Sequence, residues 1–132
     1  MLGSSKKPLI KSLIAQGTRV GGGIGYQEGL RIDGDVQGDV FASEDRPSIL
    51  VISESASVTG QVQADHIIIN GTVKGPVLAR HMLELQPKAR IVGDVSYRTL
   101  EMHQGALIAG LLRPLSLEEV DKPTLKLASK NG

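Results

Sequence analysis

Three histidines, His66, His81 and His103, are the side chains of this sequence best suited to metal chemistry. A zinc site requires its ligands to converge on one ion at about 2 Å. The histidines stand at unequal distances from the glycines of the repeat described below, so they fall on different parts of that repeat. We therefore interpret them as exposed or corner histidines and predict no metal site.

Other reactive groupings are equally scarce. Cysteine is absent, which excludes disulfides, thiolate catalysis and Cys-ligated metals and fits a cytoplasmic protein. The glycine-rich run at residues 21–25 lacks the lysine and hydroxyl of a phosphate-binding loop. Asp33, Asp35 and Asp39 alternate along one segment, and we interpret them as solvated side chains rather than a calcium site. The sequence predicts a protein that is not an enzyme and holds no cofactor.

The composition favours a narrow core. The 132 residues include 16 glycines, two tyrosines, one phenylalanine and no tryptophan, while hydrophobic residues make up 40%. Small aliphatic side chains fill thin layers better than they fill a wide globular core. The formal net charge of +1 is far from the basic excess of nucleic-acid-binding proteins. We therefore expect thin apolar layers and no nucleic-acid partner.

A repeat runs through the middle of the chain. The pattern apolar-x-Gly-x-apolar recurs around five glycines whose spacings are 22, 15, 18 and 17 residues, namely Gly38, Gly60, Gly75, Gly93 and Gly110. An alternating apolar pair precedes each copy, as Leu30 and Ile32 precede the first. The gap between pair and motif is short in two copies, where Gly34 and Gly71 make the bend, and longer in the others.

Alternation with period two predicts strands with one buried face, and glycine at a fixed phase indicates a sharp corner. A coil of about 17 residues with short strands and small corner residues is typical of a β-solenoid. An antiparallel β-sandwich is the alternative, but sandwich strands do not demand one residue type at one phase. Residues 43–48 form a polar insertion that explains the longest glycine spacing. We predict an all-β parallel β-helix of about five to six coils over residues 30–112.

The ends of this core lack an obvious polar cap. Because the first and last coils of a solenoid have backbone groups without a neighbour, uncapped ends favour association with further copies. The predicted polymerisation interface consists of Leu30, Ile32, Val36 and Val40 at one end and Leu107, Ile108, Leu111 and Leu112 at the other. Like-with-like joining and head-to-tail joining both give open filaments, and the pattern does not choose between them.

Residues 1–29 are predicted to be a flexible basic tail, in which residues 18–25 act as a linker. Residues 1–17 place four aliphatic side chains at helical spacing beside three lysines, which is typical of an interfacial anchor and far too short to span a bilayer. The predicted membrane-associating residues are Met1, Leu2, Lys6, Lys7, Leu9, Ile10, Lys11, Leu13 and Ile14. The alternative is a tail that stays solvated or docks on the first coil. Residues 113–132 are predicted to be a flexible C-terminal tail.

The phased motifs resemble those of the bactofilins, small bacterial cytoskeletal proteins that form polymers. The resemblance covers residues 30–112 and is carried by the segments GLRIDGDVQGDV at 29–40, ASVTGQV at 56–62 and INGTVKG at 69–75. It implies a right-handed β-helix with flexible tails, nonpolar end-to-end filaments formed without nucleotide, and a membrane-targeting N-terminal tail. It also implies a cytoplasmic scaffold at the inner face of the membrane that localises cell-envelope or morphogenesis proteins and influences cell shape.

A left-handed hexapeptide β-helix enzyme, either an acyltransferase or a trimeric protein resembling carbonic anhydrase, is the alternative function. Some six-residue spacing of apolar residues favours it, as do the three histidines. In the hexapeptide repeat, however, the small residue directly follows the aliphatic one, whereas here glycine follows at the second position.

Overall fold

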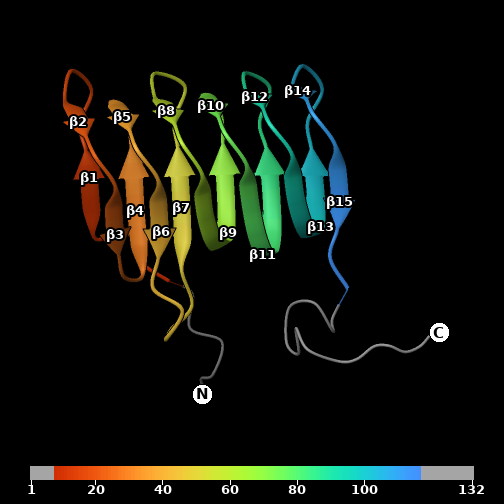
Figure 1. The fold of residues 1–132 in the computed structure, drawn as a ribbon, viewed down its shortest axis with the longest axis horizontal. Coiled ribbons are helices and arrows are strands. Elements are labelled where there is room, and N and C mark those ends of the chain that lie inside the picture. The colour runs from red at the N-terminus through yellow and green to blue at the C-terminus, as the bar shows by residue number, and fades with distance from the viewer. Residues whose placement is uncertain (1–7, 117–132) are drawn as a thin grey trace.

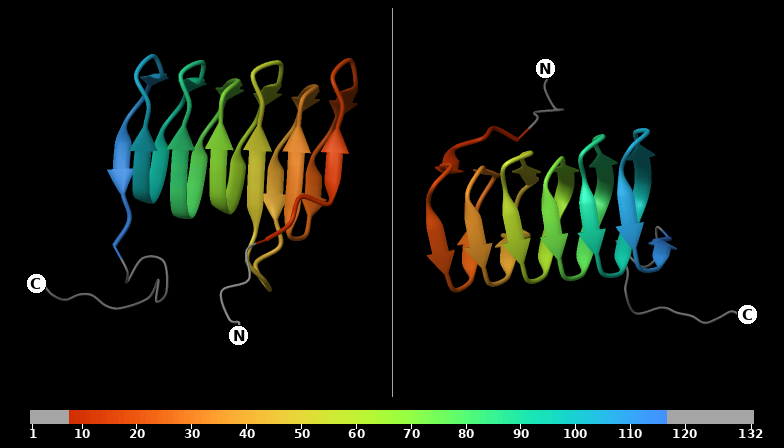
Figure 2. Two further views of the ribbon diagram at one scale, coloured as in Figure 1. Left: turned by 180° about the vertical axis from the view of Figure 1, so that it is seen from behind. Right: turned by 90° about the horizontal axis from the view of Figure 1, so that it is seen from above.

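The computed structural model describes residues 8–116, and all regular structure in this range is β-strand. The chain winds through six coils of three short strand segments each, and successive coils stack in parallel along the longest axis of the molecule (Figure 1). The first and last coils therefore lie at opposite ends of the stack (Figure 2). The predicted parallel β-helix is confirmed.

The strands follow the coils in order. The first two coils contain β1 (Ser12–Ile14), β2 (Arg19–Gly21), β3 (Ile24–Tyr26), β4 (Gly29–Ile32), β5 (Asp35–Gln37) and β6 (Val40–Ala42). The middle coils contain β7 (Ile49–Ile52), β8 (Ser57–Thr59), β9 (Val62–Ile69), β10 (Thr72–Lys74) and β11 (Val77–Leu85). The last coils contain β12 (Arg90–Val92), β13 (Val95–Met102), β14 (Leu107–Ala109) and β15 (Leu112–Pro114). The strands β9, β11 and β13 each run through a bend and link one coil to the next.

The coils have three faces. The first face consists of β1, β4, β7 and the later halves of β9, β11 and β13, and the second face is the six-stranded sheet β2-β5-β8-β10-β12-β14. The third face consists of β3, β6, the earlier halves of β9, β11 and β13, and β15. We call the turn from first to second face the first corner, the turn from second to third the second corner, and the turn into the next coil the third corner.

The first corner alternates in length along much of the stack. Its turns are short at residues 33–34 and 70–71 and longer in the other coils, so they rise to different heights at the top of Figure 1. A Cβ atom on Gly34 would overlap the Thr18 carbonyl oxygen, and one on Gly71 would overlap that of Ser53. Glycine is required at these two bends because the neighbouring coil passes so close.

The second corner is a column of stacked glycines. Gly38 donates its N–H to Thr59 in the next coil at 2.9 Å, and Gly75 donates to Val92 in the same way at 2.9 Å. A Cβ atom on Gly38, Gly60, Gly75, Gly93 or Gly110 would lie against the carbonyl of the glycine one coil earlier. The glycine phase in the sequence therefore marks one physical corner.

The core is a set of thin aliphatic layers. Inward positions of successive coils lie in register, so that Leu30, Leu50, Ile67 and Leu83 stack on the first face. All four are at most 2% exposed, and alanines fill the tighter places. This arrangement explains why the chain folds with so few aromatic residues.

The predicted boundary at residue 29 is wrong, because residues 12–26 form a complete first coil. The segment expected to be helical contains β1, which pairs in parallel with β4, and the expected linker contains β2 and β3, which pair with β5 and β6. Gly22, with φ of 128°, continues the glycine column. Pairing with the second coil therefore outweighs local helix propensity.

Two parts of the predicted tails lie outside the described residues. Residues 1–7 include Met1, Leu2, Lys6 and Lys7 of the predicted membrane-associating set, and residues 117–132 make up most of the predicted C-terminal tail. The predictions for these positions remain predictions.

Candidate functional site

The C-terminal end of the stack exposes apolar side chains. Met102 is 45% exposed and Leu112 is 48% exposed, although both occupy positions that are buried in the preceding coils. Leu100 and Ile108 are half-buried in the same layer. Their burial stops where the stack of described coils stops, so this layer is one coil short of a complete core.

Two outward positions of this last coil are also apolar. Leu107 is 59% exposed and Leu111 is 72% exposed. The register places Leu107 in line with polar residues in the other five coils: Arg19, Asp35, Ser57, Thr72 and Arg90. Leu111 occupies the position that Asp94 occupies in the preceding coil. The Asp94 carboxylate accepts a hydrogen bond from the Leu111 N–H at 3.0 Å. Apolar residues replace polar ones at the end of the molecule, as expected for a surface that another molecule covers.

The N-terminal end is formed by residues other than those predicted. Leu30, Ile32, Val36 and Val40 belong to the second coil and are at most 2% exposed, because the first coil covers them. Their prediction as end residues is therefore wrong. The layer at this end consists of Ile14, Val20, Ile24 and Tyr26, all partly buried.

The first coil was not predicted, although its sequence contains the repeat motif. Val20, Gly22 and Ile24 match the apolar-x-Gly-x-apolar pattern, and Gly22 precedes Gly38 by 16 residues, close to the other spacings. The surrounding glycines at 21, 23 and 25 made this segment look like a flexible linker. Their backbone is instead held in the sheets by pairing with the second coil.

Residues 8–14, which lead into β1 and include it, begin beside the third corner. Leu9, Ile10 and Leu13 from the predicted membrane-associating set are 62%, 45% and 56% exposed, whereas Ile14 faces the core. Lys11 forms an ion pair with Glu28 at 2.8 Å and donates its N–H to Gly29 O at 3.1 Å. The same segment therefore presents aliphatic side chains to solvent while its lysine anchors it to the corner.

The backbone conformation and the carboxylate of Glu28 both support this contact. It has a φ of 70°, which is rare for a non-glycine residue, and its carboxylate accepts the Leu9 N–H at 3.5 Å as well as pairing with Lys11. The hydrogen bond from Lys11 is the main cause that lowers the pKa of Glu28 below its ordinary 4.5. The charged carboxylate is the form that holds the segment.

The insertion at residues 43–48 is tied to the third corner by a polar network. Ser48 is 1% exposed; its N–H donates to the Asp65 carboxylate at 3.1 Å, and its hydroxyl accepts the Asp65 N–H at 3.0 Å. Asp65 also pairs with Arg80 Nε at 2.8 Å, and Glu44 Oε2 lies 3.7 Å from Arg80 Nη1. These contacts fix the loop outside the stack without interrupting the coils, as the sequence predicted.

The histidines do not converge within residues 8–116. His66 lies on β9 and His81 on β11, whereas His103 follows β13 at the first corner. His103 Nε2 lies 2.9 Å from Glu101 Oε2 and 3.6 Å from Glu84 Oε2. Among residues 8–116, Glu84, Glu101 and His103 form the one group whose ligand atoms are spaced closely enough to hold a metal ion. Glu101 and His103 are exposed to solvent. The structure therefore gives no support to a three-histidine enzyme centre.

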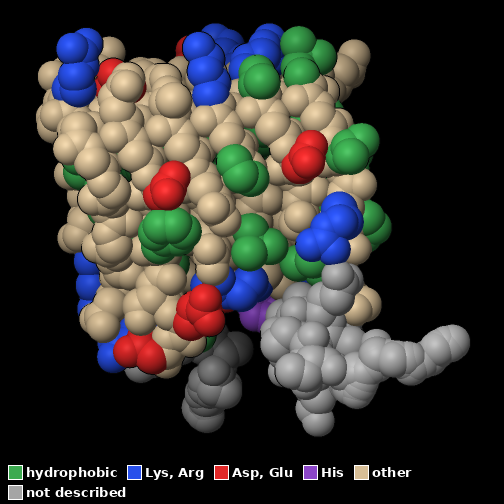
Figure 3. Space-filling model, viewed as in Figure 1, with side chains coloured by type: hydrophobic (Ala, Val, Ile, Leu, Met, Phe, Trp, Pro, Cys, Tyr) green, Lys and Arg blue, Asp and Glu red, His purple; other side chains and the backbone are tan. Residues whose placement is uncertain are grey.

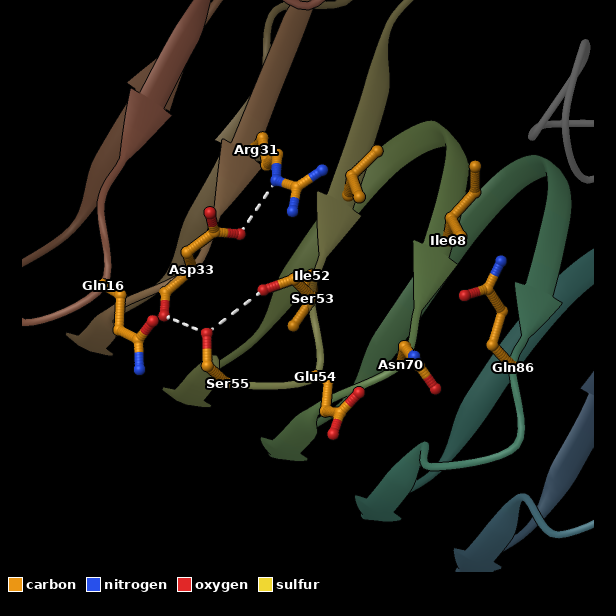
Figure 4. A pocket seen from close by; sticks show the side chains of 11 residues that line it. Gln16, Arg31, Asp33, Ile52, Ser53, Glu54, Ser55, Ile68, Asn70 and Gln86 are labelled. Atoms are coloured by element: carbon orange, nitrogen blue, oxygen red, sulfur yellow. Dashed lines mark hydrogen bonds and ion pairs between the residues drawn. The ribbon is translucent and has the colours of Figure 1, made fainter.

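A groove of about 610 Å³ crosses the first face beside the first corner (Figure 4). Arg31 pairs with Asp33 at 2.8 Å, and the Ser55 hydroxyl donates to the Asp33 carbonyl oxygen at 2.8 Å. Glu54 on the rim pairs with Lys88 at 2.8 Å. Because these polar groups bond to one another, the groove is typical of a solvated surface rather than a reaction site.

The sides of the stack differ from its ends. On the side seen in Figure 3, hydrophobic side chains are separated by backbone and polar side chains. Phe41 on the third face is 40% exposed and Val92 on the second face is 55% exposed. Among residues 8–116 there is no helix of the length and apolar character needed to cross a bilayer.

Comparison with known proteins agrees with this architecture. The family model described as "Bactofilin: Polymer-forming cytoskeletal" matches residues 12–113, which includes the first coil that the sequence pattern did not predict. Bactofilin BacO of Myxococcus xanthus (strain DK1622) is 26% identical over 102 residues, which cover 77% of this chain and 78% of that protein. No solved structure gave a significant match. The chain belongs to the bactofilin family of polymer-forming cytoskeletal proteins.

Proposed function

We propose that this protein is a cytoskeletal scaffold that assembles end to end into nonpolar filaments without nucleotide. The filaments lie at the inner face of the cytoplasmic membrane, where they localise cell-envelope or morphogenesis proteins and influence cell shape. The partners of the chain are thus further copies of itself, the membrane surface and the proteins it localises.

The observation that carries this proposal is the incomplete core at both ends. The aliphatic layers continue to the last coil, where Met102 and Leu112 are about half exposed, and to the first coil, where Ile14 and Val20 are partly exposed. Every strand of residues 8–116 belongs to a coil, so no separate element of this range caps either end. A further copy that stacks on an end pairs the free strand edges and buries these layers.

Electron microscopy of the purified full chain tests this function directly. Negative-stain images recorded without nucleotide or metal should show long filaments, and sedimentation should show the same material in the pellet. Discrete trimers would contradict the scaffold and favour the hexapeptide-enzyme alternative. Particles that stay monomeric at every concentration would contradict assembly altogether.

Membrane association is supported by the exposed aliphatic side chains of Leu9, Ile10 and Leu13 beside Lys11. Such aliphatic side chains insert into the interfacial region. Lys11 is paired with Glu28 but its side chain remains 58% exposed, and exposed lysines are attracted to anionic headgroups. A single copy binds weakly, but a filament that presents many copies gains avidity.

Liposome co-sedimentation separates this anchor from the solenoid. Leu9→Glu with Ile10→Glu should greatly reduce binding to vesicles that contain anionic lipid, while Phe41→Glu, at an exposed aromatic on the third face, should not. The substitutions leave the first coil intact, whereas a truncation at residue 29 would remove it. Equal binding by the parent and the Leu9/Ile10 variant would rule out this segment as the anchor.

A further inference from the structure

The last coil presents three strand edges, which belong to the later half of β13, to β14 and to β15. We propose that the C-terminal end joins the C-terminal end of a second copy through β14, in an antiparallel pair centred on Ile108. This proposal rests on the proposed end-to-end assembly and specifies the geometry of one joint.

The hydrogen bonds of β14 show which backbone groups are available. The Leu107 N–H donates to Ala89 O at 3.0 Å, and Ala109 O accepts the Gly93 N–H at 2.9 Å, so both residues turn their polar groups toward the fifth coil. Alternate residues of a strand direct these groups to opposite sides. The N–H and C=O of Ile108 therefore point out of the end of the stack.

The neighbours of Ile108 extend this pattern. In each earlier coil the column glycine donates its N–H to the following coil, as Gly93 does to Ala109 at 2.9 Å. Gly110 holds the same place in the last coil, so its N–H points out of the end. Ala89 O accepts the Leu107 N–H, and by the same register Ala106 O points out of the end.

These groups are complementary to themselves about a two-fold axis through Ile108. In an antiparallel pair centred there, Ile108 lies opposite Ile108 of the second copy and exchanges both hydrogen bonds with it, as in a hydrogen-bonded antiparallel pair. The Gly110 N–H then lies opposite the Ala106 carbonyl of the second copy, and the reverse holds on the other side. The same patch on both copies makes the contact, which defines an isologous joint.

The other two edges oppose such pairing. The later half of β13 carries Glu101 and β15 carries Arg113, and charged side chains on an edge strand disfavour pairing with another chain. Pro114 in β15 also lacks the N–H that its register position requires. β14 contains no charge and no proline, the devices that usually protect an edge strand.

The exposed side chains fit the same geometry. Leu107 points outward and is 59% exposed. In the proposed pair it lies opposite Ala109 of the second copy, at a non-hydrogen-bonded position where side chains approach most closely. The pairing thus covers the one leucine that replaces a polar residue in this row.

Cysteine cross-linking tests the register, and the chain contains no cysteine to interfere. Leu107→Cys and Ala109→Cys are made as separate proteins, mixed, assembled and oxidised. Non-hydrogen-bonded antiparallel partners have Cα atoms about 4.5 Å apart, within disulfide range, while the diagonal between two copies of residue 107 is about 7–8 Å. The mixture should give several-fold more disulfide-linked dimer than either variant alone.

Head-to-tail joining makes a different link. It stacks the last coil on the first coil of the next copy and places Leu107 beside Arg19, so mixed Leu107→Cys and Arg19→Cys proteins would cross-link instead. Filaments with that link would overturn both the β14 pair and the nonpolar arrangement, and filaments with neither link would overturn the β14 pair while leaving assembly intact. A chain that stays monomeric would overturn both proposals. Circular dichroism and melting curves that match the parent show that each variant is folded.

Discussion

At the residue scale, the glycine column is the feature that the sequence made most predictable. A fixed phase of glycine identifies a corner because the neighbouring coil leaves no room for a Cβ atom. By contrast, the roles of Glu28 and Asp65 could not be predicted, since their partners Lys11 and Arg80 are brought to them only by the stacking of coils. Spacing reveals a repeated steric demand, but it does not reveal single contacts between coils.

Replacing Gly75 with alanine should be among the most damaging single changes. Gly75 has a φ of 149°, and a Cβ atom there would overlap the Gly60 carbonyl oxygen. Backbone strain and steric overlap together should cost about 2 kcal/mol or more in the free energy of unfolding, measured by urea denaturation. Gly25→Ala is the matched control because no atom lies within 4 Å of the position that its methyl group would take. Equal stability of the two variants would contradict the close packing of the second corner.

Tyr26 should make stability fall in alkali. Its hydroxyl donates to Ile49 O at 3.3 Å, and burial raises its pKa above the ordinary 10.0, an effect that Arg80 partly offsets. As the pH rises above 10, the unfolded chain ionises this phenol first, so the folded state loses stability. Tyr26→Phe should therefore reduce the loss of unfolding free energy between pH 9 and pH 11. Tyr97→Phe serves as the control, and an unchanged pH dependence in Tyr26→Phe would count against the buried phenol.

At the element scale, strands in the repeat were predictable and the strands before it were not. The later coils are recognisable from their alternating apolar and polar residues. By contrast, β1 has Ser12 at an inward position, and β2 and β3 are rich in glycine. These short strands exist because the second coil provides a partner edge for each of them. Local sequence therefore underestimates an element whose stability comes mainly from its neighbour.

The loop at residues 43–48 should depend on Asp65. Asp65→Ala removes the acceptor of the Ser48 N–H and leaves the Arg80 guanidinium, which is 15% exposed, without its closest counter-charge. Removing one partner of such a largely buried pair should lower the unfolding free energy by about 3 kcal/mol. Glu44→Gln should change it by less than about 1 kcal/mol, because the Glu44 side chain is 70% exposed and lies 3.7 Å from Arg80. Urea unfolding curves that show the opposite order would contradict the network.

At the scale of the whole molecule, the stack explains why a small chain can form a cytoskeletal element. Six coils at about 4.8 Å give each subunit five steps and a length of only about 24 Å between end layers. Within residues 8–116, the same register that joins one coil to the next leaves each end with unpaired strand edges and an unfinished aliphatic layer. Of the predicted C-terminal interface residues, Ile108 and Leu112 lie in this layer and Leu107 and Leu111 point outward from the same coil, whereas the predicted N-terminal residues lie one coil away from the end.

Leu112→Arg should prevent assembly without unfolding the subunit. Leu112 stands at an inward position of the last layer and is 48% exposed, so an arginine there can remain solvated in the monomer but would be buried at a joint. The burial of an unpaired charge should raise the concentration needed for assembly at least about tenfold, which corresponds to ~1.4 kcal/mol. Phe41→Arg alters an exposed apolar residue on the third face and should assemble like the parent. Sedimentation measures both variants, and polymer formation by Leu112→Arg at the parental concentration would exclude this end as an assembly surface.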